Sequence, residues 1–177
     1  MKALKVNYDE IQKAMEDITR DTFDYFLDTQ TGEVITFSEE ILNELKNLLY
    51  DEDYEKMADE IEYIEFDQEP EVPDWMFDEA DLALEILLDS ASRYLRIPER
   101  NSDTAFTVMK EFAQTVQNPA LQKELINALN GRGAFRRFKD ILMGYPKERK
   151  RWHGYNAKAS HTEIDTWLHS YGIKPAS

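Results

Sequence analysis

The sequence contains no cysteine among its 177 residues. Disulfide bonds, thiol nucleophiles and cysteine-ligated zinc are therefore excluded, and so is the disulfide scaffold of a small secreted domain. No apolar run approaches the roughly 20 residues that cross a bilayer, and the first residues lack the apolar centre of a signal peptide. These absences predict a cytoplasmic protein with no membrane contact.

Hydrophobic residues are plentiful enough for a packed core. They make up 42% of the chain, and aromatic residues make up 12%, which argues against wholesale disorder. The length fits a single domain over residues 1–177. Two prolines and three acids stand together at 67–73, and this stretch is the candidate internal linker.

Basic residues are scarce in the first part of the chain. Residues 1–100 hold 29 acidic and 9 basic residues, a net charge of −20, whereas residues 101–177 hold 7 and 12, a net charge of +5. Either the two parts attract each other within one fold, or the basic part meets an anionic partner. The first explanation is the simpler one, because charged faces are usually solvated or locally paired.

The opening of the chain predicts a helix followed by a β-hairpin. Asn7 can cap a helix over about 7–19, whose apolar residues recur at helical spacing. Residues 22–28 and 33–37 alternate as strands do, and Gly32 between them can take the left-handed conformation that closes a short hairpin.

The next segments carry acidic residues and further element signals. Asp24 and Asp28 stand on the same predicted strand, and we expect both to face water. Ser38 is placed to cap a second helix. A third strand is expected at 61–66, and another helix over about 74–91.

The pattern of the remaining residues predicts mostly helices. A short strand at 94–98, ended by Pro98, is expected at a sheet edge. Caps, prolines and glycines then mark four helices, namely one capped by Ser102 or Asp103, one opened by Asn118 and Pro119, one over 134–143, and one from Pro146 to near Gly172. A capping box at Ser160–Glu163 predicts a break in the last helix.

These elements together predict an α+β fold. A small antiparallel sheet, made of the hairpin at 22–37 plus one or two short strands, would be packed with amphipathic helices, and the C-terminal half would be helical.

Residues 131–140, Gly-Arg-Gly-Ala-Phe-Arg-Arg-Phe-Lys-Asp, hold the candidate site. A helix start attracts anions, and its dipole disfavours arginine there, so something negative should lie close by. This negative group could be an acid from the acidic part of the chain, Asp140 one turn after Arg136, or an external phosphate. In the structural alternative the aromatic residues are core and the arginines are solvated or paired. Ion pairs from Arg136 and Arg137 to acids of residues 1–100 would favour that alternative.

We take four cations as candidate anion- or partner-binding residues: Arg132, Arg136, Arg137 and Lys139. The basic character continues downstream through Lys147, Arg149, Lys150, Arg151 and Lys158. Trp152 and Tyr155 lie among these cations and would suit base stacking if exposed, although their spacing fits a buried face more simply. The net charge of −15 opposes binding to nucleic acid.

Other chemistry finds little support in the sequence. The three histidines, His153, His161 and His169, lack a zinc motif, and Asp165 has the spacing of a helix-surface ion pair with the last two. The acids of 51–62 resemble a calcium loop, but Lys56 stands where glycine is needed. No phosphate loop or nucleophile motif occurs. We therefore predict no catalytic residue, metal site or cofactor.

Several stretches together resemble a known family. They are Val6 to Glu16, Tyr25 to Val34, Arg93 to Pro98, Met109 to Phe112, Gly131 to Asp140, Trp152, and Trp167 to Ile173. This pattern is similar to an uncharacterised bacterial protein family of unknown function, and residues 131–140 are its most specific stretch. The resemblance implies a small bacterial cytosolic protein, and it supplies no activity, cofactor or catalytic residue.

The favoured hypothesis is a non-enzymatic binding or regulatory module whose basic C-terminal helices contact an anionic partner. A protein partner or a small anionic ligand is favoured over nucleic acid. As an alternative, the acidic part of the chain binds a basic partner or mimics nucleic acid. A carboxylate-based hydrolase is a third hypothesis without a motif, and a deep pocket with converging carboxylates would support it.

Overall fold

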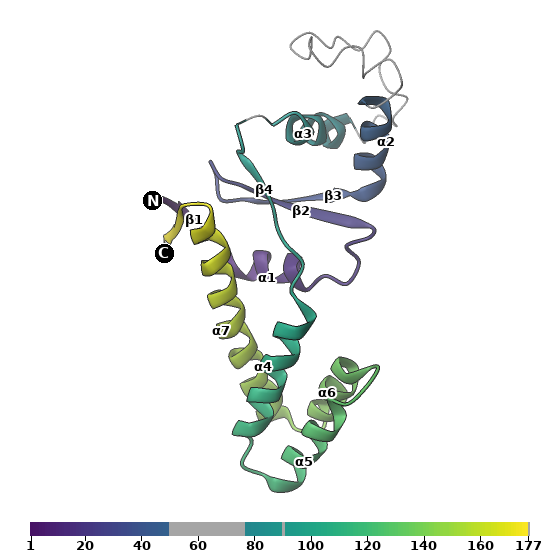
Figure 1. Ribbon diagram of the computed structural model, residues 1–177, viewed down its shortest axis with the longest axis vertical. Helices are drawn as coiled ribbons and strands as arrows, with labels where there is room; N and C mark the ends of the chain where they lie inside the picture. The colour runs from purple at the N-terminus through teal and green to yellow at the C-terminus, as the bar shows by residue number, and fades with distance from the viewer. Residues whose placement is uncertain (50–76, 90, 177) are drawn as a thin grey trace. The chain divides into compact units, whose positions relative to one another are not determined.

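A computed structural model describes residues 1–49, 77–89 and 91–176 (Figure 1). The chain forms two compact units. We call residues 1–16 with 98–177 the helical unit and residues 17–97 the sheet unit. By sequence the sheet unit holds 25 acidic and 5 basic residues, and the helical unit 11 and 16. The expected strand at 61–66, the linker at 67–73 and the acidic loop at 51–62 lie outside the described residues.

The helical unit combines five helices with a two-stranded sheet in the part of the chain that is described. In chain order its elements are β1 (Lys2–Lys5), α1 (Tyr8–Glu16), α4 (Ser102–Thr115), α5 (Pro119–Ala128), α6 (Ala134–Met143), α7 (Pro146–Ser170) and β5 (Ile173–Ala176). β1 and β5 run parallel from the Lys2–Ile173 pair to the Lys5–Ala176 pair and lie side by side in Figure 1. The sequence analysis missed this pairing, because neither four-residue strand shows alternation.

Asparagine side chains start most of these helices. Asn7 accepts hydrogen bonds from the N–H groups of Asp9 and Glu10, as predicted. Asn118 caps α5 and is followed by Pro119, also as predicted. Asn101 caps α4, so the prediction of Ser102 or Asp103 was wrong by one or two residues. In each case the amide oxygen satisfies N–H groups that have no partner inside the helix.

Helix α7 is continuous through the predicted capping box at Ser160–Glu163, so the expected break was wrong. Ser160 is buried inside the helix, as are Ile164 and Leu168 beyond it. Burial of Trp152 before the box and of Ile164 and Leu168 after it outweighs the local tendency of serine to start a helix. None of the helices that the structure describes is both long enough and apolar enough to pass through a membrane.

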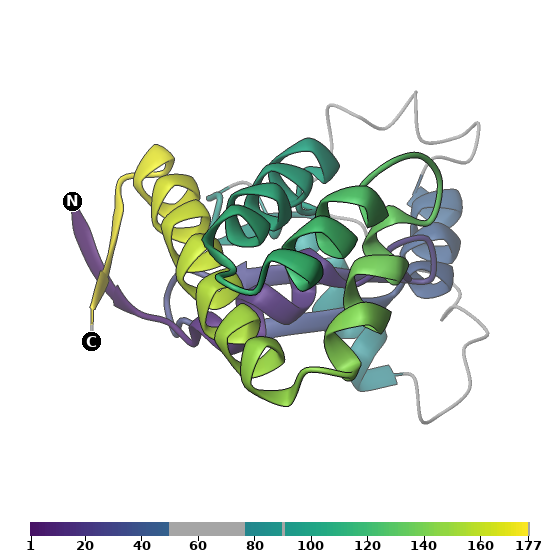
Figure 2. The same cartoon turned by 90° about the horizontal axis from the view of Figure 1, so that it is seen from below.

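An aromatic cluster forms the core of the helical unit. The rings of Phe112 and Phe138 each meet Trp152 edge to face, with centroids 5.3 and 5.1 Å away. Tyr155 packs on Phe112 at 5.5 Å. Figure 2 shows α4, α5, α6 and α7, the helices that surround this cluster. Trp152 is therefore a core residue and Tyr155 packs against the core, which confirms the simpler interpretation for these two residues and argues against a role in base stacking.

Helix α1 is anchored on α7 by polar contacts. The Tyr8 hydroxyl donates to Asp165 Oδ1 at 2.5 Å, and the Tyr8 ring lies 4.4 Å from the His161 ring. Burial and the bond to Asp165 raise the pKa of Tyr8 to about 12. In the described part of the chain Asp165 bonds Tyr8, and no ion pair links it to His161 or His169.

The sheet unit has an antiparallel sheet with the strand order β3-β2-β4. Its described elements are β2 (Phe23–Asp28), β3 (Val34–Ser38), α2 (Glu39–Leu49), α3 (Phe77–Leu87) and β4 (Tyr94–Arg96). The hairpin is as predicted, with Gly32 at a φ of +81°. β4 is an edge strand, also as predicted. Helices α2 and α3 lie on one side of the sheet (Figure 1), so the predicted α+β class is confirmed.

Asp24 and Asp28 do not face water, and that expectation was wrong. Their residues are only 7% and 4% exposed. In the strand register Asp24 stands opposite Phe37 and Asp28 opposite Tyr94. Both aromatic residues belong to the apolar core that the sheet shares with α2 and α3. The two carboxylates therefore lie on the core face of the sheet, where an unpaired charge is very costly.

Three arginines neutralise these buried carboxylates. Arg20 Nη2 and Arg96 Nε lie 2.8 and 2.7 Å from the two oxygens of Asp24. Arg93 donates two hydrogen bonds to Asp28, from Nε to Oδ1 at 3.0 Å and from Nη2 to Oδ2 at 2.7 Å. A two-pronged arginine–carboxylate contact is among the strongest charged hydrogen-bond arrangements. Three of the five basic residues of the sheet unit are thus paired with its buried aspartates, although only Arg20 is itself buried, and the Arg96 side chain is 54% exposed.

The Asp28–Arg93 pair predicts an acid-sensitive sheet unit. The hydrogen bonds from Arg93 lower the pKa of Asp28 from 3.8 to about 2. A lowered folded-state pKa stabilises the fold above about pH 4, and that contribution is lost as the pH falls through 2. Asp28→Asn should abolish about 2 kcal/mol of this pH dependence. Urea unfolding between pH 2 and pH 6 checks it, with exposed Asp21→Asn as the control. Equal pH dependence in both variants would contradict the assignment.

Candidate functional site

The structure separates the four predicted anion-binding residues into different surroundings. Arg132 is exposed, and the Arg136 side chain is 89% exposed with its Nε 3.8 Å from Asp140 Oδ2. Within the described residues, neither Arg136 nor Arg137 forms an ion pair with an acid of residues 1–100. Such ion pairs would have favoured a purely structural role for both arginines, and the described residues do not contain them.

The Arg137 guanidinium donates hydrogen bonds to backbone carbonyls. Its Nε and Nη2 donate to Ala128 O at 3.3 and 3.0 Å, and its guanidinium also donates to the carbonyls of Asn130 and Arg132. These groups end helix α5 and the following loop. The negative partner expected near this arginine is therefore the C-terminal end of α5, which carries partial negative charge.

The glycines around Arg137 make this contact possible. Gly131 and Gly133 have φ angles of +77° and +75°, which favour glycine. A Cβ atom at Gly133 would lie 3.3 Å from Arg137 Nη1. The Gly-Arg-Gly stretch thus turns the chain between α5 and α6 and leaves space for the guanidinium.

Lys139 alone of the four lines a pocket of about 220 Å³ in the helical unit. Helix α7 contributes a stripe with the spacing of one helix face, and α6 contributes a shorter one. The last residue of α1 completes the wall. The lining residues are Glu16, Lys139, Leu142, Met143, Arg149, Trp152, His153 and Asn156.

The pocket carries charges of both signs. Lys139 and Arg149 supply cations, and neither forms an ion pair with any residue that the structure describes. His153 is exposed beside them. Glu16 is the single carboxylate of the lining. Leu142, Met143 and Trp152 are the apolar residues of the lining, and Met143 is the exposed one, at 63%. Such a mixture of apolar walls with a few polar groups is typical of small-molecule sites.

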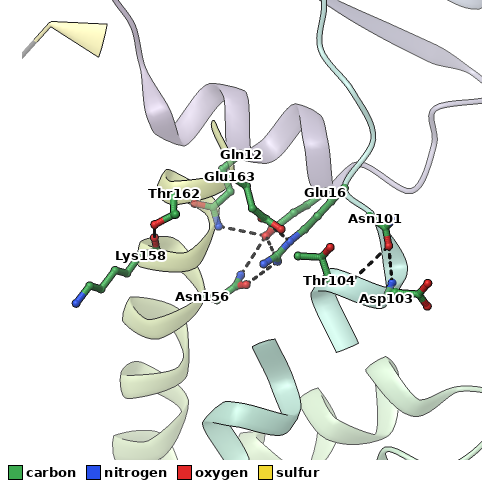
Figure 3. Close-up of polar contacts among 10 residues, drawn as sticks. Gln12, Glu16, Asn101, Asp103, Thr104, Asn156, Lys158, Thr162 and Glu163 are labelled. Atoms are coloured by element: carbon green, nitrogen blue, oxygen red, sulfur yellow. Dashed lines mark hydrogen bonds and ion pairs between the residues drawn. The ribbon is translucent and has the colours of Figure 1, made fainter. Parts of the chain in front are cut away.

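Arg100 holds the acidic wall of the pocket in place. Its side chain is 9% exposed. Nη1 donates to Glu16 Oε1 at 3.1 Å and to Asn156 Oδ1 at 2.6 Å, while Nε donates to Glu163 Oε2 at 3.0 Å. Asn156 Nδ2 in turn donates to Glu16 Oε1 at 3.0 Å. Figure 3 shows Glu16, Asn156 and Glu163 turned toward one another.

Other cations of the predicted surface have different roles. Arg151 pairs with Glu148 at 2.8 Å, donates to Thr115 Oγ1 at 2.7 Å and lies over the Phe112 ring at 4.5 Å. It is therefore part of the packing between α4 and α7. Lys147 and Lys150 are exposed, do not line the pocket, and form no ion pair within the described residues.

Glu16 and the two residues that hold it were not predicted from the sequence. Glu16, Arg100 and Asn156 come from three distant points of the chain, and no local motif connects them. Arg149 was recognised only as a continuation of the basic segment. Among the described residues, no three histidine or carboxylate side chains gather in a way that could hold a metal ion.

Comparison with known proteins places the chain in a family. Residues 54–177 match the profile of the uncharacterised protein family UPF0158. The chain belongs to this family. The match begins after the opening helix and the hairpin, which carried two of the resembling stretches, and it includes every residue of the predicted anion site.

One curated relative is a UPF0158 protein of Pseudomonas aeruginosa, which is 32% identical over 99 residues. The alignment covers 55% of this chain, and it spans 64% of the length of the relative. This bacterial relative agrees with the origin that the resemblance implied. No solved structure matches the chain.

Arg137 and Arg136 should differ in their effect on stability. Arg137→Ala removes the donors that satisfy α5 carbonyls, so we expect a loss of about 1–3 kcal/mol in the free energy of unfolding. Arg136→Ala removes only an exposed contact and should change stability by less than about 0.5 kcal/mol. Urea unfolding of the two variants measures this. Equal losses would refute the capping role of Arg137.

Arg100 should be essential to the helical unit. Arg100→Gln leaves Glu16 and Glu163 without their cation, and we expect a loss of about 3 kcal/mol. Arg100→Lys keeps the charge but replaces the fork with a single ammonium, so its loss should be intermediate. Thermal unfolding of both variants checks the order. A lysine variant as stable as the wild type would show that charge alone suffices.

Proposed function

We propose that the chain is a cytoplasmic, non-enzymatic binding module that captures the anionic group of a ligand or partner in the pocket between α6 and α7. The observation that carries the proposal is the pair of cations on its wall. Lys139 and Arg149 come from adjacent helices, line the same pocket, and lack an acidic partner among the described residues. Two cations that line one pocket without forming an ion pair leave positive charge with which a bound anion can pair.

The dimensions of the pocket favour a small group. At about 220 Å³ it is smaller than the roughly 300–1,000 Å³ typical of sites for drug-sized ligands. A phosphate, a carboxylate or one side chain of a partner protein fits this space. The predicted residues Arg132 and Arg136 are exposed cations outside the pocket, and they would attract an anionic partner from a distance rather than contact its anchoring group.

The competing hypotheses fit the pocket less well. A hydrolase of the carboxylate type needs two carboxyl groups that flank the reacting bond, and the pocket lining has only Glu16. Nucleic acid would need exposed aromatic groups or a continuous cationic track, whereas Trp152 is 4% exposed. The net charge of −20 on the sheet unit supports a basic partner as the alternative, and that hypothesis stays a prediction.

Inorganic phosphate is the probe for this proposal. Titration at constant ionic strength should raise the melting temperature and shift NMR resonances of residues 139–156, because a ligand that binds only the folded state stabilises it. Lys139→Gln combined with Arg149→Gln should abolish both effects.

The matched control is the double variant Lys110→Gln with Lys123→Gln, which removes two exposed cations of α4 and α5 that do not line the pocket. It should respond like the wild type. If the control loses the phosphate response to the same degree, phosphate is acting through overall charge and the pocket has no special role. Absence of any response to phosphate, to acidic peptides and to small carboxylates, amino acids included, would reject the proposal.

A further inference from the structure

The carboxylate on the pocket wall is held with one oxygen unused. Glu16 Oε1 accepts hydrogen bonds from Arg100 Nη1, Asn156 Nδ2 and Gln12 Nε2, at 3.1, 3.0 and 3.3 Å. No hydrogen bond or ion pair within the described part of the chain uses Oε2. An ionised carboxylate can accept about four hydrogen bonds, and its free oxygen is a strong acceptor.

The supporting contacts make this acceptor rigid. Asn156 receives a hydrogen bond from Arg100 on its oxygen and donates one to Glu16 from its nitrogen. Arg100 is nearly buried and also donates its own backbone N–H to Met15 O at 2.8 Å. Glu16 is therefore fixed by neighbours on both sides. A preorganised charge of this kind loses little freedom when a ligand binds.

The pocket thus presents a fixed carboxylate beside two unpaired cations. Lys139 and Arg149 suit a carboxylate, whereas Glu16 suits an ammonium group. Met143 and Trp152 supply apolar contact in the same lining. A simple anion would satisfy the cations and would be repelled by Glu16. A ligand with charges of both signs satisfies the whole lining.

We infer that the pocket binds a small zwitterion, namely a free α-amino acid with an apolar side chain. The inference rests on the proposed anion-binding function and adds the substrate class. The ligand carboxylate pairs with Lys139 and Arg149, the ammonium pairs with Glu16 Oε2, and the side chain packs on Met143 and Trp152. The volume of about 220 Å³ suits a molecule of this size.

The test compares three related probes on the full chain by isothermal titration. The probes are L-leucine, 4-methylpentanoate, which lacks the amino group, and 3-methylbutylamine, which lacks the carboxylate. Leucine should bind at least about tenfold more tightly than either analogue, because each analogue leaves a charged group of the pocket unpaired. Glu16→Gln should weaken leucine binding about tenfold and leave 4-methylpentanoate unaffected or more tightly bound.

Exposed Glu124→Gln on α5 is the matched control for the charge change, and it should bind leucine like the wild type. The probe comparison needs no variant, so it decides the question even if Glu16→Gln fails to fold. If leucine and 4-methylpentanoate bind equally tightly, the inference of a zwitterionic ligand is wrong and the proposed anion site is retained. The same conclusion follows if phosphate binds and leucine does not. If no amino acid, carboxylate or phosphate binds, the proposed function fails as well.

Discussion

One buried guanidinium organises the helical unit around its pocket. Arg100 lies in the segment before α4, yet it bonds the last turn of α1 through Glu16 and Met15 and bonds α7 through Asn156 and Glu163. Removing a charged group from water is costly unless its hydrogen-bonding capacity is used. Two carboxylates and an amide accept hydrogen bonds from Nε and Nη1 and offset much of that cost, while Nη2 is buried without a hydrogen-bond partner among the described residues. The wall of the pocket is a consequence of the same arrangement.

Arginine has a comparable role elsewhere in the chain. Arg20, Arg93 and Arg96 neutralise two buried aspartates, and Arg137 satisfies the carbonyls that end α5. A planar fork with five donors can meet several acceptors at once, which an ammonium cannot do. These arginines are structural, so the charge imbalance of the sequence overstates the number of cations free to bind. The lysine and arginine residues that line the pocket are Lys139 and Arg149.

The sequence predicted those parts of the fold that local chemistry determines. Asn118 followed by Pro119 has the residue preferences of a helix start, and Gly32 between two alternating runs closes a hairpin. Membership of an uncharacterised bacterial family was also predicted from the sequence, and the match to the family profile confirms it. Pairings between distant segments could not be predicted. β1 and β5 pair although they lie near opposite ends of the sequence. The burial of Asp28 likewise depends on Arg93, which comes 65 residues later. Composition shows that charges exist and does not show which ones are paired.

The aromatic core explains why a pocket exists between α6 and α7. Trp152 is held edge to face by Phe112 and Phe138, so its position is fixed from the core side while part of its side chain lines the pocket. Arg149, His153 and Asn156 occupy the same stripe of α7 as this tryptophan, one turn before it, next to it and one turn after it. Packing of one ring therefore orients three polar side chains. Because α6 is fixed by Phe138 in the same cluster, Lys139 next to it is placed by the same contacts. The core thus sets the spacing of the backbone segments that carry the cationic residues and the carboxylate that Arg100 holds, so that packing preorganises the pocket.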